Sequence, residues 1–266
     1  MIIDTHTHLN TNQLFQDYKK YLENFEEIWW KILINAGANN EYNKKWIEIS
    51  KESTINFPKL TIKTAIWWHP CDIPHNKPEI LSIINNLEKL YEENKNYIVA
   101  IWECWIDLHF PNNPPLQIQQ YALKLQAELA RKLKLPLMIH SRDGFNETIE
   151  ILKGFSDLKI YFHSRWYSSD DLQECEKIFP NLRIGCTNVI EYPSAENIRE
   201  SIKSIKTANI VTETDAPFLP PQNMRWKQNE PAYVTYVYEK LCQILSINKD
   251  NLEKIIEKNT KSLYSI

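Results

Sequence analysis

The chain has 266 residues, of which 43% are hydrophobic and 24% are charged, and its formal net charge is −3. This composition is typical of a folded globular protein and excludes an intrinsically disordered one. The slightly acidic balance also excludes a protein that binds nucleic acid over its whole surface, because such proteins are basic. Any contact with nucleic acid is therefore expected to be local to one site.

Short apolar segments rich in β-branched residues alternate with longer segments of helical periodicity along the chain. In chain order, the predicted strands are Ile2–Thr5, Ile32–Asn35, Lys63–Trp67, Ile98–Ile101, Pro136–Ile139, Lys159–Phe162, Leu182–Gly185 and Asn209–Thr212. The predicted helices are Pro78–Asn94, Leu116–Lys134, Phe145–Lys153, Ser169–Phe179, Ala195–Ile205, Pro231–Leu245 and Lys249–Ser262. Regular alternation of this kind predicts parallel strands that are covered by helices.

Eight predicted strands in a chain of this length match the size of a (β/α)8 barrel. A doubly wound open sheet is the alternative, but no G-x-G-x-x-G motif follows the first strand. The sequence shows no low-complexity linker and no internal repeat. It therefore predicts a single-domain α/β protein, a (β/α)8 TIM barrel that spans residues 1–266.

The cysteines and the N-terminus indicate where the protein is found. The five cysteines are scattered and form no C-x-x-C pair, which indicates reduced thiols rather than a disulfide framework or a thiolate zinc site. No apolar run is long enough to cross a membrane. The first residues lack the basic region and the apolar stretch of a signal peptide. We therefore expect a cytoplasmic protein without a membrane partner, and no obligate protein partner is evident.

Histidines and carboxylates occur where the predicted strands end. His6 and His8 form an H-x-H pair at the end of the first strand, and side chains two apart on a strand point to the same face. The residues that follow the fourth, fifth, sixth and eighth strands are Glu103, His140, His163 and Asp215. A buried structural histidine or a solvated acid explains any one of these residues, but not six at equivalent places. Barrel active sites are built at this C-terminal face, so we expect a metal site there.

Four imidazoles and two carboxylates suit two divalent metal ions, with one carboxylate bridging them. These ligand types accept Zn²⁺, Mn²⁺, Fe²⁺ or, less readily, Mg²⁺, and the sequence does not choose among them. A bridged metal pair holds a hydroxide at neutral pH and stabilises both the attacking and the leaving oxygen of a phosphoryl displacement.

Seven short motifs occur in order and resemble one family. They are D-T-H-T-H-L at 4–9, H-P at 69–70, E-C-W-I-D at 103–107, I-H-S-R-D at 139–143, F-H-S at 162–164, E-T-D-A-P-F-L at 213–219 and N-E-P at 229–231. Together they resemble the TatD family of metal-dependent deoxyribonucleases, a branch of the amidohydrolase superfamily. The resemblance covers nearly the whole chain.

The resemblance implies a TIM barrel with a divalent metal pair that hydrolyses DNA phosphodiester bonds, often as a 3′→5′ exonuclease, through a metal-bridging hydroxide. By matching position, His6, His8 and Asp215 would bind one ion, and His140 and His163 the other. Glu103 would bridge the two ions, and Asp215 would also take the proton from the metal-bound water.

Five further residues match motif positions of the family. His69 and Arg142 match positions near the phosphate, where a guanidinium can donate two hydrogen bonds to phosphate oxygens. The alternative for Arg142 is an ion pair with Asp143 or a neighbouring acid. Asp107, Glu213 and Asn229 match positions that would support the ligands. His109 stands where we expect an aromatic residue that contacts substrate.

Two other functions stay open. The chain can be a different amidohydrolase-type hydrolase, or a nucleic-acid-binding relative with weakened catalysis. A lysine after the fourth strand would favour the former, but Glu103 occupies that place. For the leading function, the acidic balance and the lack of a basic arm predict DNA strand ends or single strands as the substrate.

Tryptophan outnumbers glycine, 9 to 4, although a chain of this length usually contains about 19 glycines. Either other residues take the positive φ of tight turns, or the sequence is unusual. The family has glycine where this sequence has Trp67, Trp102, Trp105, Trp166 and Trp226. We hypothesise that these tryptophans are glycines misread through a variant genetic code, and that an indole beside Glu103 crowds the site. Alternatively, the indoles are genuine and stack on extruded bases.

Overall fold

A computed structural model describes the chain from residue 1 to 266 except residues 12, 29–30, 38, 67–73 and 165–166. Its eight strands are parallel and follow one another around the sheet in sequence order. The strands are β1 (Ile2–Thr7), β2 (Lys31–Ala36), β3 (Leu60–Ile66), β4 (Ile98–Asp107), β5 (Leu137–Arg142), β6 (Ile160–Phe162), β7 (Leu182–Cys186) and β8 (Ile210–Thr212). The predicted (β/α)8 barrel is thereby confirmed.

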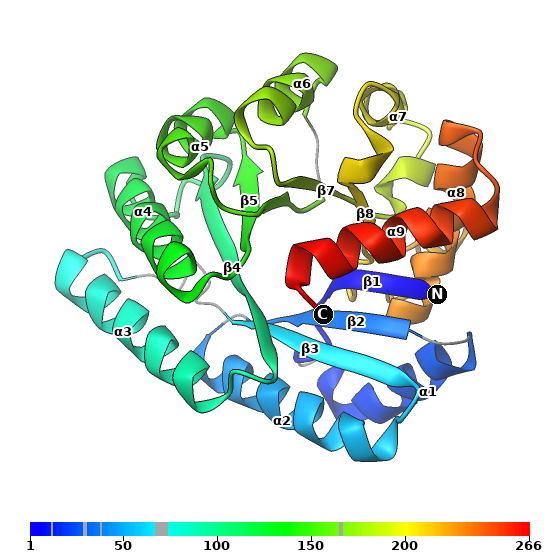
Figure 1. Cartoon of the computed structure of the whole chain (residues 1–266), viewed down its shortest axis with the longest axis horizontal. Coiled ribbons are helices and arrows are strands. Elements are labelled where there is room, and N and C mark those ends of the chain that lie inside the picture. Colours follow the sequence, from blue (N-terminus) through cyan, green and yellow to red (C-terminus); the bar gives the residue numbers. More distant parts are fainter. Residues whose placement is uncertain (12, 29–30, 38, 67–73, 165–166) are drawn as a thin grey trace.

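Helices surround the strands on the outside, as Figure 1 shows. They are α1 (Tyr18–Glu27), α2 (Asn40–Asn56), α3 (Lys77–Glu93), α4 (Leu116–Leu133), α5 (Phe145–Leu152), α6 (Ser169–Ile178), α7 (Glu196–Lys203), α8 (Val234–Leu245) and α9 (Lys249–Tyr264). No described helix is long and apolar enough to span a membrane.

The barrel closes where β1 meets β8 and the loop that follows it. The Thr5 hydroxyl donates a hydrogen bond to the Thr212 carbonyl (2.9 Å), and the Asp215 amide donates to the His6 carbonyl (2.9 Å). The His8 amide donates to the Ala216 carbonyl (2.7 Å). These contacts join the first strand to the last strand and the loop that follows it, and they bring His6, His8 and Asp215 to the same part of the barrel.

The strands β4 and β5 extend beyond the segments that the sequence predicted, and this corrects the position of two candidate ligands. Glu103 and His140 lie inside β4 and β5, not after them, because backbone pairing continues beyond the apolar segments to the pair of Asp107 with Arg142. Between Ile101 and Cys104 the register shifts by one residue, as in a β-bulge. A bulge bends a strand and redirects its side chains, so it decides where Trp102 and Glu103 point.

Residues other than glycine take the left-handed backbone conformation in the described part of the chain. They are Lys134, Asp143, Ser164, Asp215, Leu219, Ser246 and Ser265, with φ between 42° and 58°. None of them is a tryptophan. The shortage of glycine in tight turns is therefore met by other residues, and any need for glycine at a described tryptophan must come from space rather than from φ.

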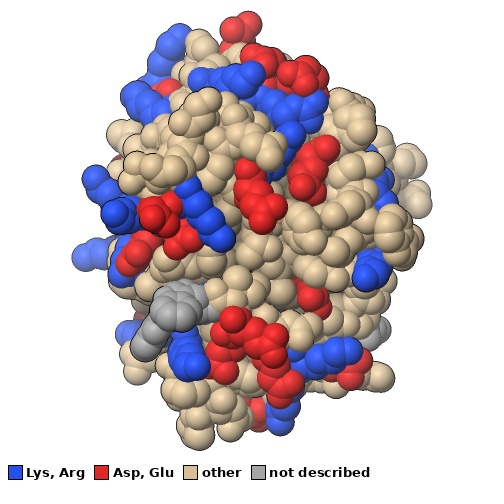
Figure 2. All heavy atoms as spheres, turned by 90° about the vertical axis from the view of Figure 1, so that its right-hand side faces the viewer, with Lys and Arg blue, Asp and Glu red and all other residues tan. Residues whose placement is uncertain are grey.

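The charges on the surface are mixed. On the face drawn in Figure 2, acidic and basic side chains are interspersed among uncharged ones, and no broad basic area covers that face. The formal net charge of −3 agrees with this picture. Attraction of a long polyanion by this face is therefore not expected.

Candidate metal centre

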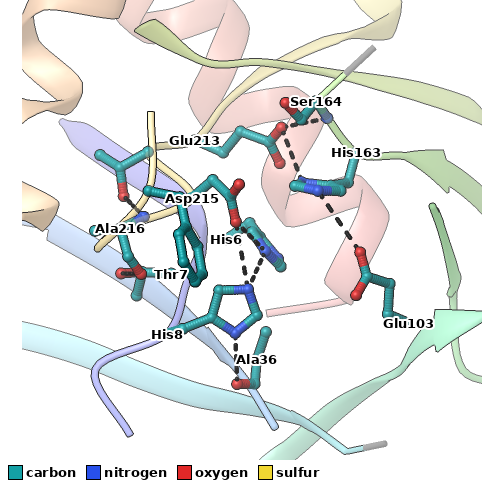
Figure 3. A network of polar contacts seen from close by, with 12 residues as sticks. His6, Thr7, His8, Ala36, Glu103, His163, Ser164, Glu213, Asp215 and Ala216 are labelled. Atoms are coloured by element: carbon teal, nitrogen blue, oxygen red, sulfur yellow. Dashed lines mark hydrogen bonds and ion pairs between the residues drawn. The ribbon is translucent and has the colours of Figure 1, made fainter. Parts of the chain in front are cut away.

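The first group of candidate ligands joins the two ends of the barrel sheet. His6 and His8 lie two residues apart on β1, and Asp215 follows β8 (Figure 3). His6 Nε2 lies 2.9 Å from His8 Nε2 and 3.1 Å from Asp215 Oδ1, and His8 Nε2 lies 3.3 Å from the same oxygen. Atoms bound to one tetrahedral ion at about 2.0–2.1 Å are about 3.3 Å apart, so these three atoms suit one ion.

The second group lies beside the first and comes from three neighbouring strands. Glu103 Oε1 lies 3.0 Å from His140 Nδ1 and 3.7 Å from His163 Nε2. The rings of His163 and His6 have their centres 4.3 Å apart, so the two groups adjoin. The ligand atoms of each group lie within 4.8 Å of one another, as do those of a third combination, His6, His163 and Glu213.

The remaining ring nitrogen of three of these histidines faces an acceptor, as metal-bound histidines require. His8 Nδ1 lies 3.3 Å from the Ala36 carbonyl, which orients its Nε2 toward the first group. His163 Nδ1 lies 3.3 Å from Glu213 Oε1, and His140 Nε2 lies 3.8 Å from Asp107 Oδ2. The structure thus places Asp107 and Glu213 where the motifs predicted supporting residues. The donor types of both groups and the residues that support them are those that a divalent ion requires.

Electrostatics keep the carboxylates of both groups ionised. Burial alone would raise the pKa of Asp215, but the charge of His163 and hydrogen bonds with His6 and His8 hold it below its ordinary value. Burial is likewise outweighed at Glu103, whose pKa is lowered to about 2 by His140, His163 and His6. Burial lowers the pKa of His6 to about 4, whereas at His8 the hydrogen bond and charge of Asp215 outweigh burial and raise the pKa. Neutral imidazole and ionised carboxylate are the forms that bind metal.

A buried network fixes the backbone beneath the ligands. Asp4 Oδ1 accepts hydrogen bonds from the amides of His6 (3.1 Å) and Thr214 (3.0 Å), and its Oδ2 accepts from the Thr214 hydroxyl (2.6 Å). Glu213 accepts from the Tyr161 hydroxyl and from the Ser164 amide (2.6 Å). The motifs did not single out Asp4 as a supporting residue, although it precedes the H-x-H pair by two positions.

Two residues show how closely this network is packed. A Cβ on Gly185 of β7 would lie 2.4–2.7 Å from the carboxylate atoms of Glu213, so no larger residue fits there. The Asn229 amide is fully buried and donates to the carbonyls of Thr214 (2.9 Å), Phe218 and Leu219. Asn229 therefore holds the segment that carries Asp215 in place.

Next to the ligands lies a cavity of about 780 Å³, lined by residues that include His140, Arg142, His163 and Asp215. Arg142 does not form the ion pair with Asp143 that we considered as an alternative. Its Nη2 lies 2.9 Å from His109 Nε2, and His109 Nδ1 lies 3.0 Å from Asp143 Oδ2. The guanidinium thus stands at the cavity with a histidine partner that the motifs left without a defined role. His69 lies outside the described residues.

The tryptophans at glycine positions differ in their surroundings. The Trp102 side chain is fully buried, and its ring centre lies 3.9 Å from that of His6. It is therefore not available for stacking on a base. Trp226 is 77% exposed. Trp67, Trp166 and the side chain of Trp105 lie outside the described part of the structure.

Comparison with known proteins agrees with this site. The sequence matches the family described as TatD related DNase over residues 3–265. It is 30% identical over 268 residues, covering 100% of both chains, to the uncharacterized metal-dependent hydrolase YabD of Bacillus subtilis. It is 28% identical to the 3′-5′ ssDNA/RNA exonuclease TatD of Citrobacter rodentium over 176 residues, which are 64% of this chain and 66% of that one.

The fold has close counterparts among solved structures. The crystal structure of YJJV, a TatD homologue from Escherichia coli, superposes with a TM-score of 0.88 and 23% identity, covering 100% of this chain and 98% of that one. The barrel, the two groups of metal-ligand side chains and the sequence match over nearly its whole length lead to one conclusion. The chain belongs to the TatD-related DNase family of metal-dependent hydrolases.

Proposed function

We propose that this protein is a divalent-metal-dependent deoxyribonuclease that hydrolyses phosphodiester bonds from the 3′ end of single-stranded or frayed DNA. One observation carries the proposal. Two adjoining groups of imidazole and carboxylate side chains lie at the mouth of the barrel, beside a cavity that also holds the Arg142 guanidinium. Divalent ions held by these two groups would supply an activated water and neutralise charge on the attacking and leaving oxygens of a phosphoryl displacement.

The proposal assigns a role to each of the six candidate ligands. His6, His8 and Asp215 would hold one ion, His140 and His163 the other, and Glu103 would bridge them. Asp215 would also accept the proton of the attacking water, since its carboxylate would stand beside both the ion and the nucleophile. That carboxylate is fixed by the backbone contact between Asp215 and His6.

Arg142 would bind the scissile phosphate. Its side chain is exposed at the cavity and carries a charge that no described carboxylate neutralises through a direct ion pair. Charge-assisted hydrogen bonds from a guanidinium to a phosphate are short and directional. The neighbouring His109 would orient the guanidinium, since it lies between Arg142 and Asp143. His69, which matches a phosphate-side position of the motifs, is proposed for the same role.

Two exposed aromatic side chains favour a substrate with unpaired bases. Phe110 is 49% exposed, and the Arg142 guanidinium carbon lies 5.2 Å from its ring centre. Phe218 is 50% exposed, and its ring centre lies 6.2 Å from that of His8. Aromatic rings beside a phosphate site stack on bases that are not held in a duplex. The activity named for the Citrobacter relative, on single-stranded DNA and RNA, supports the same substrate class.

Trp102 favours a second candidate function for the chain as written. Its indole lies against two of the candidate ligands, His6 and His163, with ring centres 3.9 and 5.0 Å away. A site crowded in this way suits a relative that binds nucleic acid with weakened catalysis. The two functions differ in whether replacing the motif tryptophans by glycine restores cleavage.

The test is digestion of single-stranded DNA labelled at either end, with Mn²⁺, Zn²⁺, Mg²⁺ or Fe²⁺ added. It compares the chain as written with a variant that combines Trp67→Gly, Trp102→Gly, Trp105→Gly, Trp166→Gly and Trp226→Gly. We expect the glycine variant to shorten strands from the 3′ end in the presence of at least one metal. Adding Glu103→Ala should abolish cleavage, whereas Glu150→Ala, at an exposed acid on α5, should not. A correctly folded glycine variant that cleaves with none of the metals would contradict the proposal.

A further inference from the structure

The indole of Trp102 lies inside the candidate metal centre. Trp102 is placed by the β-bulge of β4, immediately before Glu103, and its side chain has no exposed surface. Its ring centre lies 3.9 Å from that of His6 and 5.0 Å from that of His163. Because His6 belongs to the first ligand group and His163 to the second, the indole contacts both groups.

These three rings are packed against one another. The ring centres of His6 and His163 are 4.3 Å apart, so Trp102, His6 and His163 form a triangle with sides of 3.9, 4.3 and 5.0 Å. Packed aromatic rings usually have their centres 4.5–7 Å apart, so these rings are in direct contact. An ion at the second group, with ligands at about 2.0–2.1 Å and a bound water, needs space beside His163, and the indole packs against that ring.

Two polar atoms at the contact between the indole and His6 also lack partners. Trp102 Nε1 is buried without a hydrogen-bond acceptor, and His6 Nδ1 is buried without a partner. A buried N–H that has lost its water and gained no acceptor is unfavourable. The indole therefore fills this space without forming the polar contact that a native buried tryptophan usually makes.

We propose that residue 102 sets how many metal ions the centre holds: the indole excludes the second ion, and glycine at this position admits it. The indole also contacts His6 of the first group, but the three ligand atoms of that group already lie 2.9–3.3 Å apart, as binding of one ion requires. The ligand atoms of the second group lie further apart, since Glu103 Oε1 is 3.0 Å from His140 Nδ1 and 3.7 Å from His163 Nε2. This group contacts the indole through His163. This inference rests on the metal centre of the proposed function.

The experiment counts ions directly. Protein stripped with a chelator is titrated with Mn²⁺ and, separately, Zn²⁺, and bound metal is measured by calorimetry and elemental analysis. The chain as written is compared with Trp102→Phe, Trp102→Ala and Trp102→Gly. Trp226→Gly is the matched control, since it makes the same change at a side chain that is 77% exposed.

We expect about one ion per chain for the protein as written and for Trp226→Gly, and about two for Trp102→Gly. The second ion should bind at least about tenfold more tightly to Trp102→Gly than to the protein as written. Its affinity for Trp102→Ala should fall between these two values. If Trp102→Gly does not fold, as judged by circular dichroism, Trp102→Ala carries the same comparison.

Two results would overturn the inference, and only one of them would also contradict the metal centre of the proposed function. Equal stoichiometry and affinity in all variants would show that residue 102 does not control the centre, while the metal centre itself would stand. Absence of metal binding in every correctly folded variant would overturn both the inference and the metal centre of the proposed function.

Discussion

Arg142 brings the only guanidinium among the residues we place at the candidate active site. Charge-assisted hydrogen bonds contribute about 1.5–3 kcal/mol each, so Arg142→Ala should lower kcat/KM on single-stranded DNA by about 10- to 100-fold. Arg142→Lys should recover only part of this loss, because an ammonium group cannot donate in the same paired geometry. Steady-state kinetics of the metal-loaded glycine variant measure the effect.

Arg131 on α4 offers the matched control for this prediction. It is an exposed arginine that pairs with Asp157 outside the barrel mouth. Arg131→Ala should leave kcat/KM within about twofold of the parent protein, since exposed ion pairs contribute little. An equal loss in the Arg142 and Arg131 variants would show that Arg142 has no special role in binding phosphate.

The exposed rings of Phe110 and Phe218 should act on substrate binding rather than on chemistry. Base stacking contributes about 1–3 kcal/mol per base, so Phe110→Ala and Phe218→Ala should each raise KM for a single-stranded oligonucleotide by roughly 5- to 100-fold. The value of kcat should change little, and Leu81→Ala on α3, another exposed apolar side chain, should change neither constant. A fall in kcat at unchanged KM would argue against stacking.

The candidate ligands could be predicted from the sequence because each one lies in the C-terminal half of a barrel strand or in the loop after it, where side chains converge. The contact between Arg142 and His109 could not be predicted. It joins a residue at the end of β5 to one just beyond β4, and their spacing in the sequence gives no sign of it. The position of Glu103 inside a bulge was also hidden, because a bulge has no periodic signature.

At the level of elements, the segment between β8 and α8 carries Asp215 and depends on Asn229. Asn229→Ala would leave three carbonyl groups without their buried donor. We expect the free energy of unfolding to fall by about 2–4 kcal/mol, measured by urea denaturation. Gln228→Ala, at the exposed neighbour whose amide donates to the Gln13 carbonyl, should change it by less than about 1 kcal/mol. Similar values for the two variants would contradict the role assigned to Asn229.

The sequence predicted all eight strands but missed two helices. In α2, polar residues occupy part of the buried face: Asn43, Ser50 and Ser53 are buried beside Trp46 and Ile47. The Ser50 hydroxyl lies 2.9 Å from that of Thr64 on β3, so a hydrogen bond takes the place of an apolar contact. Helical periodicity is read from apolar residues, and this substitution hid it. In α1 only Leu22 and Phe25 are buried, too few to define a period.

At the scale of the whole molecule, the acidic charge and the local site predict a preference among DNA substrates. Opening a duplex to reach a phosphate in the site costs a few kcal/mol, and this surface offers little charge to offset it. We expect closed circular duplex DNA to be cleaved at least about tenfold more slowly than short single strands of equal nucleotide concentration. Gel-based rates with both substrates test this, and equal rates would contradict it.

The composition of the chain now has a partial structural explanation. Seven residues other than glycine take positive φ in the described part of the chain, so the turns account for part of the missing glycine. Trp102 is different, because its difficulty is the space that its indole takes from the metal ligands. The hypothesis that glycine codons are misread as tryptophan is therefore supported by the surroundings of Trp102 more than by the low number of glycines in the chain. It predicts that the codon for residue 102 is not the standard tryptophan codon.

Removal and return of metal tests the central claim, that this site hydrolyses phosphodiester bonds with bound ions. The glycine variant is stripped with a chelator, dialysed, and given Mn²⁺ in steps, while bound metal and the rate of single-strand cleavage are measured on the same sample. The proposed function predicts no cleavage by the stripped protein and a rate that rises with occupancy to a plateau near two ions per chain. Cleavage by the stripped protein at the rate of the loaded one would contradict it.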